Sequence, residues 1–431
     1  MLKSMKMNYN THTLANGLRI IHLPSAQPVV YCGYAVGAGT RDEELGREEG
    51  MAHFCEHITF KGTERRSSMQ ILGYLESVGG DLNAFTNKEE TVYHAAVLKE
   101  NIDRAVDLLT DIVFHSTYPQ AEIDKEVEVI VDEIESYNDS PAELVYDLFE
   151  NAVFGGHPLG HNILGTAEKL RRYTTADALR FTRRYYRPEN SVFFAYGDVD
   201  FRKLVRLLER ANANVAAVSL PPQQQALCDE SAGCGGGKDT ATAVLPPYVA
   251  QHIEHHMDTH LAHVMLGTRA YDVHDERRIA LYLLNNILGG PGMNAKLNLA
   301  LREHNGLVYT VESTMVAYGD TGTWSIYFGC DEHDIKRCLR LVRKELDRMM
   351  EKPLSDSQLK AAKKQIKGQI GVACDNRENF ALDFGKSFLH YGWEKNVDCL
   401  YEQVEAITSQ QIQDVARELF DKDRLITLIF K

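Results

Sequence analysis

The chain has 431 residues, of which 44% are hydrophobic and 25% charged, a composition that excludes disordered, collagen-like and rod-shaped proteins. Its 47 basic and 61 acidic residues give a net charge of −14, which argues against general binding to nucleic acid or anionic lipid. No apolar run approaches the roughly 18 residues of a membrane-spanning helix. The length suggests two or three domains. The N-terminal residues show no apolar leader, so we expect a cytoplasmic protein.

Strand patterns occur in two groups along the chain. Alternating, β-branched and aromatic residues predict strands at 18–23, 29–39 and 90–98, and a second group of strands at 262–271, 323–329 and 424–430. Between the groups, residues 211–247 are rich in Gly, Ser and Pro-Pro pairs, which is typical of a linker. The sequence therefore predicts an N-terminal domain at 1–210 and a C-terminal domain at 248–431.

The helical patterns of the two domains match each other. In both, an amphipathic helix is followed by a proline, a long polar helix and a second amphipathic helix. Aligning Lys125 with Lys360 places Phe149 on Phe384 and keeps register for some fifty residues, which indicates a duplication. We expect an α+β fold of two tandem homologous domains, each a mostly antiparallel sheet with helices packed on one face.

A histidine pair stands at helical spacing in the segment EEGMAHFCEHITFKGT. His53 and His57 are at i and i+4, so on a helix both imidazoles leave the same face, one turn apart. Glu56 lies between them in sequence. Neutral imidazoles suit Zn²⁺, and the carboxylate inside the spacing makes this the inverted form of the helical H-E-x-x-H zinc motif. The pattern predicts a zinc site that needs one more protein ligand.

The acidic segment EVEVIVDEIESYNDSP is the candidate source of that ligand. Helical periodicity turns its apolar residues toward a core and places Glu126 and Glu133 on nearly one face. A solvated charge run is an equally open interpretation of the pattern. The segment offers five acidic candidates: Glu126, Glu128, Asp132, Glu133 and Glu135.

Taken together, these motifs resemble the pitrilysin and insulin-degrading-enzyme family of inverted-motif zinc peptidases, above all its short branch of the mitochondrial processing peptidase type. The resemblance implies that Glu133 is the third zinc ligand and that Glu126 orients a ligand imidazole. The stretch LNAFTNKEETVY is similar to the family segment in which an edge strand takes up substrate, here Asn83, Ala84 and Phe85.

A further resemblance lies in GGPGMNAKLNLALREHNGLVYTV, which is similar to the family's signature with a substrate-binding arginine and tyrosine. It places these roles on Arg302 and Tyr309. The loop departs from the family pattern at Pro291 and at residues 294–296, which leaves its conformation open.

The resemblance implies a zinc-dependent endopeptidase with one zinc ion per chain. Glu56 would be the base that activates water, and Arg302 and Tyr309 would hold carbonyl oxygens at the transition state. Unstructured peptides would be cut in a chamber enclosed by a homodimer. Two alternatives are a non-catalytic, core-type scaffold subunit and a hetero-oligomer in which another chain supplies the arginine and tyrosine.

Overall fold

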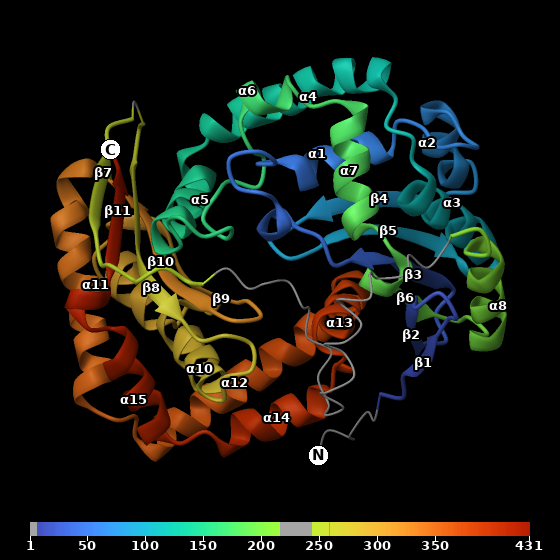
Figure 1. Ribbon diagram of the computed structural model, residues 1–431. Coiled ribbons are helices and arrows are strands. Elements are labelled where there is room, and N and C mark those ends of the chain that lie inside the picture. The colour runs from blue at the N-terminus through green and yellow to red at the C-terminus, as the bar shows by residue number, and fades with distance from the viewer. Residues whose placement is uncertain (1–6, 216–243, 258) are drawn as a thin grey trace. The chain divides into compact units, whose positions relative to one another are not determined.

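The computed structural model describes residues 7–215, 244–257 and 259–431 (Figure 1). Most of the predicted linker, residues 216–243, lies outside the described residues. The described chain forms two compact units that are not contiguous in sequence. The first unit contains residues 7–134, 163–215 and 374–396, and the second contains the rest.

The first unit is built on a six-stranded sheet with the order β1-β2-β6-β3-β5-β4. Its strands are β1 (Asn10–Thr13), β2 (Arg19–Pro24), β3 (Val29–Val36), β4 (Asp81–Thr86), β5 (Thr91–Leu98) and β6 (Ser191–Gly197). β2 and β6 are parallel and every other pair is antiparallel.

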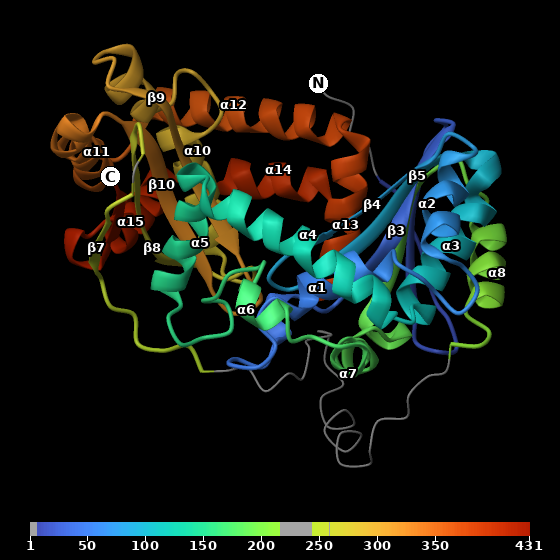
Figure 2. The same cartoon turned by 90° about the horizontal axis from the view of Figure 1, so that it is seen from above.

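Helices of the first unit pack on both faces of this sheet. They are α1 (Met51–Thr59), α2 (Ser68–Glu76), α3 (Ile102–His115), α4 (Gln120–Asn138, in this unit up to Ile134), α6 (Ala167–Leu170), α7 (Thr175–Tyr185), α8 (Phe201–Ala211) and α13 (Arg377–Tyr391). Figures 1 and 2 show α3 and α13 on opposite sides of β3 and β6, and both helices contact β3.

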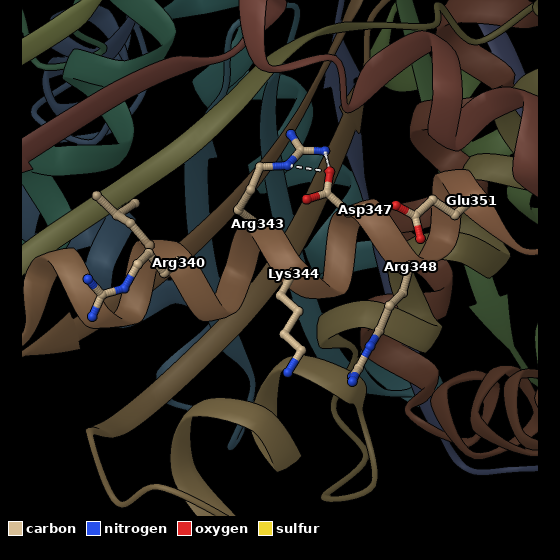
Figure 3. Close-up of a pocket in the computed structure, with 7 residues that line it drawn as sticks. Arg340, Arg343, Lys344, Asp347, Arg348 and Glu351 are labelled. Atoms are coloured by element: carbon tan, nitrogen blue, oxygen red, sulfur yellow. Dashed lines mark hydrogen bonds and ion pairs between the residues drawn. The ribbon is translucent and has the colours of Figure 1, made fainter.

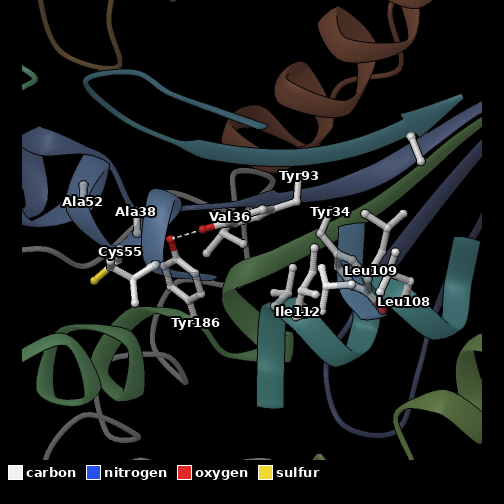
Figure 4. Close-up of a cluster of buried hydrophobic side chains, with 14 of the residues drawn as sticks. Tyr34, Val36, Ala38, Ala52, Cys55, Tyr93, Leu108, Leu109, Ile112 and Tyr186 are labelled. Carbon is white, nitrogen blue, oxygen red and sulfur yellow. Dashed lines mark hydrogen bonds between the residues drawn. The ribbon is translucent and has the colours of Figure 1, made fainter. Parts of the chain in front are cut away.

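The main core of the first unit lies on the face covered by α1 and α3. Leu108 and Leu109 of α3 and Cys55 of α1 belong to it (Figure 4). Within this core Tyr93 and Tyr186 share a hydrogen bond of 2.9 Å between their hydroxyls. Pairing these hydroxyls inside an apolar core removes the cost of burying them alone.

The opposite face is covered by α13. Phe380 and Phe384 of this helix pack edge-on against Tyr196 and Phe194 of β6, with ring centroids 6.2 and 6.3 Å apart. A Cβ on Gly385 would lie 2.7 Å from the Phe194 ring, so the close approach of helix and sheet depends on that glycine. Side chains therefore cover β6 on both faces.

The second unit has a five-stranded sheet with the order β7-β11-β8-β10-β9. Its strands are β7 (His252–His255), β8 (Ala262–Ala270), β9 (Val308–Ala317), β10 (Gly322–Cys330) and β11 (Ile426–Phe430). β7 and β11 are parallel and the other pairs are antiparallel. Its helices are α5 (Pro141–Val153), α10 (Arg277–Gly289), the π-helix η4 (Asn298–Glu303), α11 (Ile335–Glu351), α12 (Asp356–Asp375), α14 (Val397–Ala406) and α15 (Ser409–Leu419).

This sheet is also covered twice. Phe149 of α5 lies against Gly267 of β8, whereas Trp324 of β10 packs on Phe420 beyond α15 and donates to Asn285 of α10 at 3.1 Å. All nine residues of β10 are buried. The α+β class with two mixed, helix-packed sheets is confirmed. The sequence predicted helices on one face of each sheet, whereas in the structure helices cover both faces. The reason is that the central strands are apolar on both sides.

The outer face of α11 is strongly basic. Arg340, Lys344 and Arg348 line a groove of about 560 Å³ at successive steps of one helical turn (Figure 3). Arg343 donates to Asp347 at 2.7 Å. The opposite side of α11 is buried, so these charges form the solvated face of an amphipathic surface helix.

Within the described ranges, no helix is both long and apolar enough to cross a membrane.

Candidate metal centre

The start of α1 is fixed by a tight turn and by a distant carboxylate. Gly50 precedes the helix with φ 83°, and a Cβ there would lie 2.8 Å from Gly165 Cα. The buried Glu43 carboxylate accepts from the backbone N–H groups of Gly50 at 2.9 Å and Ala52 at 2.8 Å. These two bonds satisfy donors that a helix start leaves free. They fix the helix start and so the direction in which its histidines project.

The predicted ligands lie together in the first unit. The rings of His53 and His57 have centroids 4.7 Å apart. Glu133 of α4 lies with Oε2 3.3 Å from His57 Nε2 and Oε1 3.8 Å from His53 Nε2. Two ligands about 2.1 Å from one tetrahedral ion lie about 3.4 Å apart, so this donor set fits zinc.

The two histidines differ in protonation. Burial, reinforced by the charge of His57, lowers the pKa of His53 to about 4, which leaves the neutral imidazole that a metal requires. Burial also acts to lower the pKa of His57, but its hydrogen bonds to Glu126 and Glu133 outweigh burial and raise the pKa to about 9. The two carboxylates thus favour a positive charge at this point, which a metal ion supplies as well as a proton does.

Glu126 holds the far side of His57. Its Oε1 lies 3.1 Å from His57 Nδ1, and its Oε2 forms an ion pair of 2.6 Å with Lys61 Nζ. Burial would raise the pKa of Glu126, yet these two partners lower it below its usual value. A carboxylate on Nδ1 leaves Nε2 for a metal and fixes the ring plane.

Glu56 is buried beside this pair of rings. Its Oε2 accepts a hydrogen bond of 2.6 Å from Thr86 Oγ1. Burial raises its pKa, while the Thr86 hydrogen bond and His57 act in the opposite direction. A buried carboxyl group with a raised pKa is suited to both accepting and returning a proton.

The predicted substrate strand is β4, which ends the sheet order. Asn83, Ala84 and Phe85 pair with β5 on one side, and the described chain places no strand on the other. An open edge of this kind exposes backbone N–H and C=O groups to an extended peptide.

Arg302 and Tyr309 lie together in the second unit. The Arg302 guanidinium carbon is 5.7 Å from the centroid of the Tyr309 ring, and Tyr309 is 83% exposed. Both line a pocket of about 520 Å³ whose wall includes Pro291 and Met293 of the glycine-rich loop. Beside this pocket Asn294 Nδ2 donates to Gln365 Oε1 at 3.0 Å, which anchors the loop that departs from the family pattern.

Another group of potential ligands occurs in the described part of the chain. Asp331, His333 and Asp334 cluster at a short turn, but none of the three is buried. Exposed acidic turns are usually solvated, so the set on α1 and α4 is the stronger candidate.

Three contributors at the α1 site were missed by the sequence reasoning: Glu43, Lys61 and Thr86. Lys61 stands one helical turn after His57, a spacing that could have pointed to it. Glu43 and Thr86 act through folding contacts that no local pattern displays.

The fold and the donor set are those of a metallopeptidase-type protein, and comparison with known proteins agrees. Residues 20–167 match the family model described as insulinase (peptidase family M16), and residues 172–366 match that of the peptidase M16 inactive domain. The chain belongs to peptidase family M16. The predicted family is confirmed, with both of its domains in tandem.

Relatives match along nearly the whole chain. An uncharacterized zinc protease of Bacillus subtilis is 31% identical and the alignment covers 97% of each protein. One from Streptomyces coelicolor is 32% identical over 97% of this chain and 88% of its own length. Among solved structures, a protease from Helicobacter pylori shares the fold with a TM-score of 0.85 at 20% identity, covering 99% of each chain.

Proposed function

We propose that this protein is a zinc-dependent endopeptidase that hydrolyses unstructured peptides. The observation that carries the proposal is the convergence of His53, His57 and Glu133 at distances that suit one zinc ion, with Glu56 buried beside them. The names of the bacterial relatives, zinc proteases, support it. We propose one ion per chain, because two histidines and a glutamate converge in this way once among the described residues.

The chain's own groups divide the chemistry. His53, His57 and Glu133 would hold a zinc ion, which would supply Lewis-acid polarisation of the scissile carbonyl and a lower pKa for water. Glu56 takes the proton of the attacking water and returns it to the leaving amine. Glu126 keeps the His57 ring in its binding orientation. The peptide adds to the edge of β4 at Asn83, Ala84 and Phe85 by backbone hydrogen bonds, which favours extended substrates of varied sequence.

Arg302 and Tyr309 are proposed to bind substrate and to hold the oxygen on which charge develops. They belong to the second unit, whereas His53, His57 and Glu133 belong to the first. We propose a homodimer, as the family resemblance implies, whose chamber combines the zinc centre of one chain with this pair from the other. The cytosolic location stays a prediction.

The activity is tested with an unstructured fluorogenic peptide. We expect hydrolysis by the purified chain, loss of hydrolysis with a chelator, recovery on adding zinc, and one bound zinc per chain by elemental analysis. Glu56→Gln should lower kcat roughly a thousand-fold while zinc remains bound. Stoichiometric zinc without any hydrolysis would instead favour the non-catalytic scaffold.

The dimeric arrangement is tested by mixing two inactive variants. Glu56→Gln removes the proposed base, and Arg302→Ala removes the proposed substrate-binding arginine. In a mixed dimer the Arg302→Ala chain keeps its zinc centre and receives an intact arginine from its partner, so an equal mixture should recover about a quarter of wild-type activity. Absence of recovery in a dimer that exchanges chains would place both halves in one chain.

A further inference from the structure

Thr86 connects the proposed base to the proposed substrate strand. It is the last residue of β4 and is buried, and its hydroxyl makes the 2.6 Å hydrogen bond to Glu56 Oε2. Among the described residues, no other hydrogen bond to the Glu56 carboxylate is found. One oxygen of Glu56 is thus held, and the other is left for a water molecule.

The direction of this hydrogen bond is fixed by its neighbours. Thr91 lies 3.4 Å from Thr86, but it donates its single hydroxyl proton to the carbonyl oxygen of Ala38 at 2.8 Å. The proton of Thr86 is therefore free to go to Glu56, since an ionised carboxylate can only accept. A hydrogen bond to an ionised acceptor is among the stronger kinds in proteins.

The alternation of β4 explains why this residue can reach α1. Leu82 and Ala84 pack against the core on the α1 side, and Thr86 follows them at the same period of two. Phe85 points to the other face, where its ring lies 6.0 Å from that of His94. The strand that would bind substrate through its backbone therefore positions the base through a side chain.

The second unit contains a comparable contact with different chemistry. Asn285 of α10 donates to the carbonyl oxygen of Ser313 in the edge strand β9 at 2.9 Å, and its Oδ1 accepts from the Ser313 hydroxyl and from Trp324. Here a neutral amide donates one hydrogen bond and accepts two, and it joins the helix to the sheet. In the first unit the group held by the edge strand is a carboxylate with one oxygen left open.

We propose that Thr86 is the positioning residue for Glu56, and that through it the substrate strand β4 sets the orientation of the base. This inference rests on the proposed function. Thr86 does not touch the substrate bonds that react. It limits the rotation of the Glu56 carboxylate, so that docking of a peptide on β4 and alignment of the base occur on one rigid strand.

The test compares Thr86→Val, which keeps the shape and removes the hydroxyl, with Thr86→Ser, which keeps the hydroxyl. We expect Thr86→Val to lower kcat ten- to a hundred-fold with KM within about two-fold and with zinc content unchanged. Thr86→Ser should stay within about three-fold of wild type in kcat. A purely structural role would not give this split between kcat and KM or this recovery by serine.

A second pair of measurements covers the failure cases. Thr86→Ala also removes the hydroxyl, and it should show the same loss as Thr86→Val. In a Glu56→Gln background, Thr86→Val should cause no further loss, because no base remains to be positioned. Thr91→Ser, a change at the neighbouring hydroxyl, serves as the matched control with near wild-type kcat.

Each other result has a defined meaning. Wild-type kcat in Thr86→Val, or an equal loss in Thr86→Ser, would overturn the inference while leaving the peptidase intact. Unfolding of both hydroxyl-free variants would assign the hydroxyl to stability and overturn it as well. Absence of chelator-sensitive hydrolysis in the wild type would instead refute the proposed function.

Discussion

The two units share the topology of five strands, and the first unit adds the strand β1 and the polar side chains of the candidate metal centre. In each, a parallel pair of strands (β2 and β6, or β7 and β11) is followed by three antiparallel neighbours that end in an edge strand, β4 or β9. The long helices α4 and α12 correspond in the alignment of Lys125 with Lys360. Glu133 then falls on Gly368, and α10 carries no pair of histidines. The apolar pattern thus specifies the same fold in both units, whereas the polar residues of the candidate metal centre are found in the first unit.

The largest effect is expected at Glu133, where the aligned helix of the second unit has Gly368. Glu133→Gln should abolish stoichiometric zinc binding and lower activity on the order of a thousand-fold, because two imidazoles alone hold zinc weakly. Glu128→Gln on the same helix is the control, since its carboxylate is exposed and pairs with Arg171 at 2.9 Å. Zinc retained at one ion per chain in Glu133→Gln would contradict the assigned ligand.

A smaller effect is expected for Glu126, which contacts His57 but not the proposed ion. Glu126→Gln should weaken zinc binding ten- to a hundred-fold, measured by competition with a chromogenic chelator. An unchanged affinity would mean that the ring of His57 is oriented by its other contacts alone.

The shared core of the two units can be probed at matched glycines. A Cβ on Gly33 of β3 would lie 2.4 Å from the Tyr93 carbonyl oxygen, and one on Gly267 of β8 would lie 2.2 Å from that of Trp324. Each alanine variant should lose about 3 kcal/mol of unfolding free energy by overpacking. Gly73→Ala and Gly368→Ala are the controls, with open space around both positions, and should be neutral or slightly stabilising. Tolerance at only one of Gly33 and Gly267 would break the equivalence of the two sheets.

The helices α13 and α5, which each cover one face of a sheet, are held by different polar contacts. In the first unit, His390 of α13 lies 2.9 Å from Glu90, whereas in the second, Tyr318 donates to Glu150 of α5 at 2.7 Å. Burial alone would raise the pKa of Glu90, but the hydrogen bond and charge of His390 outweigh it, together with Lys386, and lower the pKa to about 2.

This contact should make acid stability depend on Glu90. Because its pKa is lower in the folded than in the unfolded state, its stabilisation is full above about pH 5 and is lost as the pH falls toward 2. Between pH 6 and pH 3 the stability advantage of wild type over Glu90→Gln should shrink by roughly 2 kcal/mol, measured by denaturant unfolding. A constant difference across this range would contradict the assigned ion pair.

Much of this molecule could be predicted from sequence, because its strongest signals are local. The spacing of His53 and His57 is decided within one helical turn, and the strand patterns follow from side-chain alternation. Glu133 required the family resemblance, since periodicity places Glu126 and Glu133 on one face and does not choose between them.

The rest depends on contacts between distant segments. The apolar face of α13 predicts that the helix is buried but not which sheet it covers, and the same holds for α5. Thr86 reads as an ordinary strand residue until the folded chain places it against Glu56.

The placement of α13 also bears on how the protein is made. β6 ends at Gly197, but the helix that shields its Phe194 and Tyr196 begins only at Arg377. During synthesis one apolar face of the first sheet therefore stays exposed until nearly the whole chain has left the ribosome. Such a contact between distant segments slows folding and favours aggregation. A shortened gene product ending in the linker would carry His53, His57 and Glu133 but would leave Phe194 and Tyr196 without their α13 partners.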